Sequence, residues 1–257
     1  MIHGDDAAVL LEILAEIKKF PKSVRYNTRN ESEFKQGMNR PAFCMGSIHS
    51  FRQGPRISVA TSSPELQPLL KALLLLMKLY HPTFKFSSIQ VNKNFSAGSL
   101  HVDNNQGPSI MISVGNFKGG NLYIDGVGER QTRNQFVQFD GNVPHMALDY
   151  KGGDRYSFVF FTSTSFIKLP EQQKKELKRI GFPIPSPKKL QDYIASSAPL
   201  RKITRAKRVE AARERMPAYI RAQDKGSLPA GARSSVRGNA YYKKLQVGKP
   251  ARRHPQT

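Results

Sequence analysis

Three side chains that can bind a metal ion stand in the middle of the chain: His101, Asp103 and His145. In an extended segment, residues 101 and 103 point to the same face while Val102 turns toward the core, because side chains alternate along a strand. A third ligand must then come from a strand that is distant in sequence but adjacent in space. His145 follows a turn and opens an extended run, as such a ligand should. The spacing therefore predicts one metal site built from these three residues.

An anion-binding pair follows ten residues after His145. Arg155 opens the apolar run Tyr156–Phe161, and its planar guanidinium can pair with a carboxylate through two parallel hydrogen bonds. Ser157 lies two residues further on, so it faces the same side of an extended segment and can donate to the same group. The pair predicts a carboxylate-binding site next to the metal.

Short extended runs, separated by glycine and asparagine turn signals, must position these residues. The seven predicted strands are Ser87–Val91, Ser99–Asp103, Ile110–Val114, Asn121–Ile124, Gln135–Phe139, Pro144–Leu148 and Tyr156–Thr162. No helix-length segment separates them, which argues against a βαβ fold. The pattern predicts a mainly β core, a sandwich or double-sheet barrel with flanking helices, of the α+β class.

Helical periodicity lies outside this core. Apolar spacing predicts a helix over residues 7–20, which Pro21 ends. A second helix is predicted over residues 64–80, because Ser63 supplies an N-cap and a proline occupies the first helical position. The polar residues 22–40 between the two helices are predicted to be a connection.

By composition the chain divides into three parts. Residues 1–82 are a helical segment that supports the core, residues 83–167 hold the strands, and residues 168–257 form a basic extension, partly helical and partly disordered. This extension holds 23 Lys/Arg against 6 Asp/Glu, a net charge of +17 out of +22 for the whole chain. The positive charge is therefore concentrated in the C-terminal third.

Two clusters of basic residues lie in this extension. They are Lys174, Lys175, Lys178 and Arg179, and then Arg201, Lys202, Arg205, Lys207, Arg208, Arg213 and Arg215. Such clusters can neutralise several phosphates in a salt-dependent and sequence-tolerant way. Tyr241-Tyr242, before Lys243-Lys244, could stack on bases. The sequence therefore predicts nucleic acid as a partner, with a solvated basic tail as the simpler alternative.

The order of His-x-Asp, a distal His and Arg-x-Ser resembles the Fe(II)/2-oxoglutarate-dependent oxygenase superfamily over about residues 86–165. Two His and one carboxylate with open positions suit non-haem Fe(II). The resemblance implies a double-stranded β-helix, or jelly roll, in which His101, Asp103 and His145 bind Fe(II). It also implies that Arg155 and Ser157 hold the distal carboxylate of 2-oxoglutarate, whose keto acid end chelates the iron.

Other stretches carry the resemblance further. The segment Gln90–Phe95 is similar to a strand that places side chains near 2-oxoglutarate, which makes Asn92 and Asn94 cosubstrate candidates, although many members have tyrosine where this chain has Asn94. His101–Ser109 and Arg155–Phe161 resemble the branch of TET and J-base-binding-protein oxygenases, which oxidise 5-methylpyrimidines in DNA. The implied dioxygenase reaction consumes O₂ and 2-oxoglutarate, yields succinate and CO₂, and hydroxylates a substrate C–H bond. The protein would supply positioning and a water-poor pocket.

Other chemistries lack their residues. A cupin site needs His-x-His with a nearby Glu, whereas position 103 is Asp, and the chain has no His-Glu-x-x-His of a zincin. The single Cys44 excludes a disulfide framework and is interpreted as a small buried hydrophobe. The apolar run Leu69–Tyr80 is too short for a membrane span, and the first residues lack a secretory signal. These features predict an intracellular protein, nuclear or otherwise associated with nucleic acid.

Three hypotheses follow. The first is an oxygenase that acts on a nucleic-acid base such as a 5-methylpyrimidine, because the ligand order and the basic tail occur together. The second keeps the oxygenase but makes the substrate a protein side chain, as in prolyl and lysyl hydroxylases, since the fold does not decide the substrate. The third is a jelly-roll protein that binds nucleic acid and has lost activity.

Overall fold

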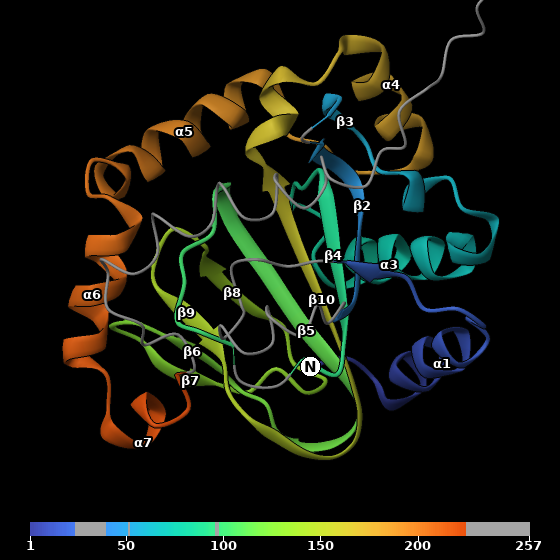
Figure 1. The fold of residues 1–257 in the computed structure, drawn as a ribbon. Helices are drawn as coiled ribbons and strands as arrows, with labels where there is room; N and C mark the ends of the chain where they lie inside the picture. Colours follow the sequence, from blue (N-terminus) through green and yellow to red (C-terminus); the bar gives the residue numbers. More distant parts are fainter. Residues whose placement is uncertain (24–39, 51, 96–97, 225–257) are drawn as a thin grey trace, which may run out of the picture. The chain divides into compact units, whose positions relative to one another are not determined.

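Two antiparallel sheets form the β part of the fold (Figure 1). The computed structural model describes residues 1–23, 40–50, 52–95 and 98–224, so the predicted Tyr241-Tyr242 and Lys243-Lys244 lie outside the described residues. The larger sheet has the order β1-β2-β4-β10-β5-β8, with β3 paired to β2. Its strands are β1 (Lys22–Ser23), β2 (Arg40–Ser50), β3 (Gly54–Ile57), β4 (Ser88–Lys93), β5 (Asn105–Gly119), β8 (Val137–Asp140) and β10 (Tyr150–Ser163).

The smaller sheet has the order β7-β6-β9. Its strands are β6 (Leu122–Ile124), β7 (Gly128–Arg130) and β9 (His145–Ala147). Apolar side chains fill the space between the sheets, in one cluster of Met111, Leu122, Ile124, Val137 and Phe139. The inner faces of both sheets therefore enclose a common interior.

Alternation along β10 separates the core from the candidate site. Tyr156, Phe158 and Phe160 belong to the large hydrophobic cluster on the outer face of the larger sheet. Arg155 and Ser157 alternate with them and therefore point to the inner face. A register shift between Gly152 and Arg155 marks the start of this arrangement. Alternate residues of β10 thus face either the hydrophobic core or the candidate site.

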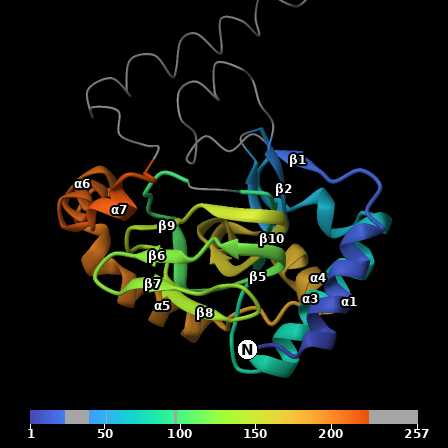
Figure 2. The same ribbon diagram turned by 90° about the horizontal axis from the view of Figure 1, so that it is seen from below.

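Helices cover the outer face of the larger sheet (Figures 1 and 2). They are α1 (Gly4–Ala15), α3 (Gln67–Tyr80) and α4 (Glu171–Ile180). The short 3-10 helices η2 (Val59–Thr61) and η3 (Pro64–Leu66) precede α3, and η4 (Thr164–Lys168) precedes α4. Helix α3 buries Leu69, Leu73 and Met77 at helical spacing against the sheet. Each such side chain stabilises the fold by about 1.5–3 kcal/mol. None of the helices in the described ranges is long and apolar enough to cross a membrane.

Three further helices pack on the other side: α5 (Pro187–Arg201), α6 (Arg205–Arg215) and α7 (Ala218–Arg221). Tyr193 of α5 lies so close to Gly107 of β5 that a Cβ there would come within 2.4 Å of its ring. Ala212, Met216 and Ile220 form a cluster with the outer face of the smaller sheet. The division of the chain at residue 168 stays a prediction, but these contacts place residues 187–224 against the strands.

The structure confirms antiparallel sheets with flanking helices, as the α+β class requires. The predicted strand Ser99–Asp103 is represented only by an isolated bridge at His101, and the first helix ends at Ala15, before residue 20. The sequence interpretation did not include β2, which lacks a regular alternation. Its backbone turns through Gly46 at φ +87°.

Gly46→Ala should destabilise the protein more than Gly54→Ala. Both glycines have positive φ, which costs an L-residue about 1–2 kcal/mol, but a Cβ at Gly46 would lie 2.1 Å from the Ser87 carbonyl oxygen, whereas Gly54 faces open space. We expect a loss of about 3 kcal/mol or more for Gly46→Ala and about 1 kcal/mol for Gly54→Ala in urea unfolding. Equal losses would show that the close approach at Gly46 does not matter.

Candidate metal centre

Side chains from two segments of the chain converge on one point. His101 forms an isolated β-bridge with His145, the first residue of β9, and Asp103 follows two residues later. One ligand atom from each of the three residues lies within 4.8 Å of the others. The Asp103 carboxylate oxygens lie 3.8 Å from His101 Nε2 and 3.6 Å from His145 Nε2. The structure therefore brings together the predicted ligand set.

Backbone contacts fix the orientation of both imidazoles. The backbone N–H of His101 donates to the His145 carbonyl at 3.1 Å, and the reverse hydrogen bond measures 2.9 Å. Nδ1 of His101 lies 2.8 Å from the Ser99 carbonyl, and Nδ1 of His145 lies 2.8 Å from the Val143 carbonyl. Since a carbonyl only accepts, Nδ1 carries the proton in the neutral ring and Nε2 keeps its lone pair. Both rings are thus prepared to bind a cation through Nε2.

Burial and charge act in opposite directions on His145, whose side chain is buried. Burial is the largest single influence and lowers the pKa of His145, whereas the hydrogen bond and negative charge of Asp103 raise it. The hydrogen bond to the Val143 carbonyl and the charge of Asp140 add to the increase. The net pKa of His145 lies above its ordinary value. The site therefore favours positive charge, whether a proton or a metal ion.

Hydrogen bonds to neighbouring residues hold both the carboxylate and the backbone of Asp103. Asn105 Nδ2 donates to Asp103 Oδ2 at 3.1 Å, and the Asp103 backbone N–H donates to the Gly141 carbonyl at 2.7 Å. A Cβ at Gly141 would lie 3.1 Å from the Asp103 Cβ, so glycine allows the two backbones to approach closely. These contacts restrict the carboxylate to one orientation.

Arg155 is a buried cation whose side-chain partners are carbonyl groups. Its side chain is 1% exposed, with Nη1 donating to the Phe95 carbonyl at 3.2 Å and Nη2 to the Gly120 carbonyl at 3.0 Å. Its Nε has no hydrogen-bond partner in the described structure. Burial lowers the pKa of Arg155 to about 10, against a smaller opposite effect of Tyr150. A bound carboxylate would supply the missing acceptor and the missing negative charge.

Polar side chains adjoin Arg155 on the inner face of the sheet. Ser157 is buried between β4 and β5, where Asn92 and Ser113 are its cross-strand neighbours. Asn92 Nδ2 donates to Ser157 Oγ at 3.2 Å. A second chain runs from the Ser113 hydroxyl through Thr132 to the Gly120 carbonyl that also accepts from Arg155. Hydroxyl and amide groups thus continue the polar surface beside the guanidinium.

Asn94 supports the backbone of Arg155. Its Oδ1 accepts from the Arg155 N–H at 2.8 Å, its own N–H donates to the Arg155 carbonyl, and its Nδ2 donates to Asp154 at 2.7 Å. The residue is exposed and has φ 56°, a conformation that asparagine tolerates. Among the cosubstrate candidates, Asn92 lies beside Ser157, while Asn94 anchors the end of the strand.

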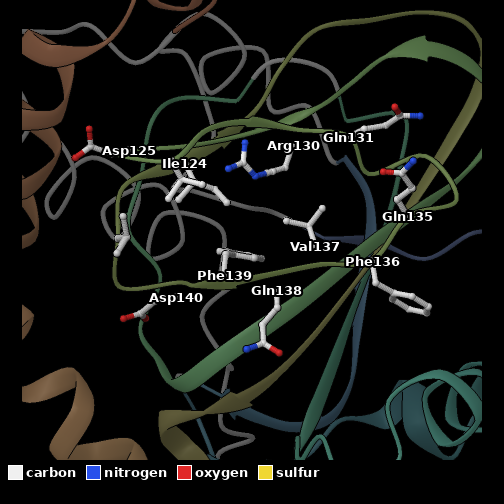
Figure 3. A pocket seen from close by; sticks show the side chains of 12 residues that line it. Ile124, Asp125, Arg130, Gln131, Gln135, Phe136, Val137, Gln138, Phe139 and Asp140 are labelled. Atoms are coloured by element: carbon white, nitrogen blue, oxygen red, sulfur yellow. The ribbon is translucent and has the colours of Figure 1, made fainter. Parts of the chain in front are cut away.

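A pocket of about 490 Å³ lies between β8 and the end of β6 (Figure 3). Ile124, Val137 and Phe139 point into it, while Phe136 points away. The three candidate ligands do not line this pocket, but the Phe139 ring packs edge-on against His145 at a centroid distance of 4.8 Å. One aromatic ring thus separates the pocket from the metal centre.

Several members of the predicted basic clusters form hydrogen bonds or ion pairs with other residues of the chain. Lys174 and Arg179 pair with Glu171 and Glu176 on their own helix. Arg201, Arg208, Arg213 and Arg215 contact Asn142, Asp224 or Asp125. The prediction that the basic clusters bind nucleic acid stays a prediction, and these four arginines already have partners within the protein. Sequence analysis did not identify Asn105 and Asn142 as supports of the site, because only the fold brings them together.

Comparison with known proteins gives likenesses of fold. No family model and no curated protein sequence matches the chain. NgTET1 in complex with 5mC DNA is 16% identical, covering 58% of this chain and 72% of that chain at a TM-score of 0.36. A 2OG-Fe(II) oxygenase-family protein from Burkholderia pseudomallei is 14% identical, covering 59% and 76% at a TM-score of 0.39.

A viral collagen prolyl hydroxylase from Paramecium Bursaria Chlorella virus-1, in its 2OG complex, is 12% identical. The match covers 62% of this chain and 90% of that chain at a TM-score of 0.35. At these TM-scores the likenesses do not establish a reaction, so the chemistry depends on the side chains of this chain itself. In its motifs, His101-x-Asp103, the distal His145 and Arg155-x-Ser157, the chain is similar to the 2-oxoglutarate- and Fe(II)-dependent oxygenases.

Proposed function

We propose that this protein is an Fe(II)/2-oxoglutarate-dependent oxygenase, with its two sheets arranged as a jelly roll. We propose further that it hydroxylates a C–H bond on a nucleic-acid base such as a 5-methylpyrimidine. The observation that carries the proposal is the convergence of His101, Asp103 and His145 within 4.8 Å, with both imidazole Nδ1 atoms engaged by backbone carbonyls. That geometry leaves two Nε2 lone pairs and a carboxylate directed at one cation.

The donor set fits Fe(II). Two imidazoles and one carboxylate would hold the ion and would leave coordination positions open for a cosubstrate and O₂. When bound, the iron would supply the activation of O₂ and the oxidation of the substrate C–H bond. The protein contributes the fixed orientation of the ligands through Ser99, Val143 and Asn105.

Arg155 and Ser157 would hold the distal carboxylate of 2-oxoglutarate. The Arg155 guanidinium is buried, its Nε has no partner, and no carboxylate of the described residues pairs with it, so its burial is costly unless an anion binds. The Ser157 hydroxyl and the Asn92 amide lie on the same inner face and would complete the polar surroundings. The apolar cluster around Phe139 would exclude water from the remaining space.

Exposed cations beside the metal centre support a nucleic-acid substrate. Arg201 and Arg208 fix the junction of α5 and α6 to Asn142, in the loop between β8 and His145. The residues between these two anchors include the exposed Lys202, Arg205 and Lys207. Residues 225–257 add eight Lys/Arg and no Asp/Glu to the charge of the chain. The exposed Lys202, Arg205 and Lys207 would retain a polyanion beside the metal centre.

Replacing Lys202, Arg205 and Lys207 with Gln should weaken DNA binding and its salt dependence. If each cation neutralises one phosphate, the slope of log K against log salt should fall by about 2.7. Fluorescence anisotropy with duplex DNA at several salt concentrations measures this slope. A control with the same charge change replaces the exposed residues Lys18, which follows α1, and Lys71 and Lys78 of α3. Equal losses in both variants would contradict a local DNA-binding surface.

Product analysis tests the substrate itself. The protein is incubated with Fe(II), 2-oxoglutarate and methylated DNA, and the nucleosides are analysed by mass spectrometry for an oxidised methyl group. A parallel reaction contains proline- and lysine-rich peptides. Oxidised peptides without oxidised nucleosides would favour the protein side-chain hydroxylase. DNA binding without succinate formation in either reaction would favour the inactive binding protein.

A further inference from the structure

A network of arginine and asparagine side chains lies directly behind the Asp103 carboxylate. Its members are distant from one another in the sequence: Asn105 from the start of β5, Asn142 from the loop before His145, and Arg201 and Arg208 from α5 and α6. Asn105 is 6% exposed and Asn142 is 1% exposed, so their side-chain amides have little access to water as an alternative hydrogen-bond partner. The network therefore links the C-terminal helices to a metal ligand.

Arg201 makes two contacts through two different nitrogen atoms of its guanidinium. Its Nη2 donates to the Asn105 carbonyl at 2.6 Å, and its Nε donates to Asn142 Oδ1 at 3.2 Å. The Asn142 amide in turn donates through Nδ2 to the same Asn105 carbonyl at 3.2 Å and to Asp140 Oδ1 at 2.9 Å. Arg201, Asn142 and Asn105 thus form a closed triangle of hydrogen bonds.

Arg208 fixes the other side of the same loop. Its Nη1 donates to the Asn142 carbonyl, and its side chain is largely buried, at 8% exposure. The Asn142 backbone N–H donates to Asp140 Oδ1 at 2.8 Å. Both hydrogen-bonding groups of the Asn142 backbone are therefore occupied, and the loop that precedes His145 has little freedom.

The network ends on the metal ligand. Asn105 Nδ2, whose residue is fixed by Arg201, donates to both Asp103 Oδ2 and Ser109 Oγ at 3.1 Å. Gly141, adjacent to Asn142, accepts from the Asp103 backbone N–H at 2.7 Å. The Asp103 carboxylate and backbone thus both depend on residues that α5 and α6 hold in place.

The segment before His101 is held from the same side. The Leu100 backbone N–H donates to Asp224 Oδ1 at 3.0 Å, and Arg213 of α6 binds Asp224 Oδ2 at 2.6 Å with the carboxylate buried. Hydrophobic packing alone could dock α6, since Ala212 and Met216 already contact the smaller sheet. Burying guanidinium groups on backbone carbonyls has a desolvation cost. A role in positioning the ligand loops would explain why these arginines are buried despite that cost.

We propose that Arg201, through Asn142 and Asn105, is a positioning residue that holds the Asp103 carboxylate in its metal-binding orientation, an inference that rests on the proposed metal centre. Arg208 secures the same loop from α6. Helices α5 and α6 would then contribute to metal binding. Their arginines differ in role: Arg201 and Arg208 support the ligand loops, whereas Arg205 is an exposed cation. Metal affinity should therefore depend on a side chain that never touches the metal.

Anaerobic titration with Co(II) alone tests this role, because the visible spectrum of Co(II) reports both affinity and ligand geometry. Arg201→Gln should weaken Co(II) binding by about 10-fold or more and alter the spectrum, as expected for loss of an outer-shell support. Asn105→Ala should act in the same direction, since it removes the direct hydrogen bond to Asp103. Lys188→Gln, at an exposed position of the same helix α5, is the matched control and should bind Co(II) like the wild type.

Thermal unfolding of the metal-free variants separates positioning from a general loss of fold. A folded Arg201→Gln protein with wild-type Co(II) affinity and spectrum would overturn the inference. If Arg201→Gln does not fold, Arg201→Met serves instead: it keeps much of the side-chain volume but has no donor, and unchanged Co(II) binding by that variant would also overturn the inference. Failure of the wild-type protein to bind Co(II) would instead refute the proposed metal centre.

Discussion

Asp103→Ala should abolish both metal binding and substrate-coupled succinate formation. The carboxylate is the only anionic member of the described group, and its oxygens lie 3.6 and 3.8 Å from the two imidazole nitrogens. Loss of an outer-shell partner typically costs about 10–100-fold in affinity or activity, so loss of the ligand itself should cost more than about 100-fold. Anaerobic Fe(II) titration and succinate release measure the two effects.

The metal-free protein provides a second measure of the same change. The charge and hydrogen bond of Asp103 raise the pKa of His145, against the effect of burial. Without Asp103, burial predominates, and the pKa of His145 should fall below its wild-type value. An NMR titration of the imidazole in the metal-free protein would record this fall.

Asp192→Ala is the matched control, because Asp192 is exposed on α5. It removes one negative charge from the same protein and should leave Fe(II) affinity and turnover unchanged. Retention of full turnover by Asp103→Ala, with the control also unchanged, would show that the three residues do not hold the catalytic metal. The oxygenase proposal would then lose the observation that carries it.

The ligand set was predictable because it depends on local geometry. His101 and Asp103 are two residues apart in an extended segment, so their placement on one face follows from the alternation of side chains. His145 and Arg155 also begin extended runs, β9 in one case and the apolar part of β10 in the other. The alternation of side chains along extended segments thus identified the candidates. The fold brings the three candidate metal ligands together and places Arg155 on the inner face of the larger sheet.

The supports of the site depend on contacts across long stretches of sequence. Arg201 contacts the Asn105 carbonyl across 96 residues, and Arg208 contacts Asn142 across 66. Nothing in the sequence distinguishes these arginines from Lys202 or Arg205, since all belong to one charged helical stretch. Charge counting therefore assigned the same role to residues that the fold separates into internal supports and exposed cations.

Strand β2 shows a different limit of sequence analysis. Its residues Arg40–Ser50 contain Pro41 and Gly46, both unfavourable in strands, and no clear alternation. Pairing with β3 and β4 nevertheless stabilises it in the larger sheet. Pairing with neighbouring strands here outweighs the low intrinsic strand preference of these residues. Residue propensities alone therefore could not predict β2.

Arg155→Met should abolish 2-oxoglutarate binding while leaving metal affinity largely intact. Breaking a buried ion pair by removing one partner costs about 3–5 kcal/mol, which corresponds to more than about 100-fold in the dissociation constant for the cosubstrate. Met occupies a similar volume but offers no donor to a carboxylate. Isothermal titration of the Co(II)-loaded protein with 2-oxoglutarate measures the loss, and Co(II) titration measures the retained metal affinity.

Arg155→Met should have a much smaller effect on the stability of the ligand-free protein. Burial lowers the pKa of Arg155 to about 10, so the charged form is less favourable in the folded than in the unfolded protein. That penalty is fully present at neutral pH and diminishes only as the pH rises above about 10. Met removes the penalty, which should offset the loss of hydrogen bonds to the Phe95 and Gly120 carbonyls.

Ligand-dependent stabilisation should separate the two roles of the guanidinium. At a concentration of 2-oxoglutarate about 100 times its dissociation constant, the wild-type protein should gain about 2.7 kcal/mol, and Arg155→Met should gain nothing. Arg155→Lys keeps the charge without the planar fork and should fall between them. Arg133→Gln, an exposed arginine near the same Phe117 ring, is the control and should retain the full gain. If Arg155→Met retained that gain, 2-oxoglutarate would have to bind elsewhere, and the unpartnered Nε of Arg155 would belong to the fold alone.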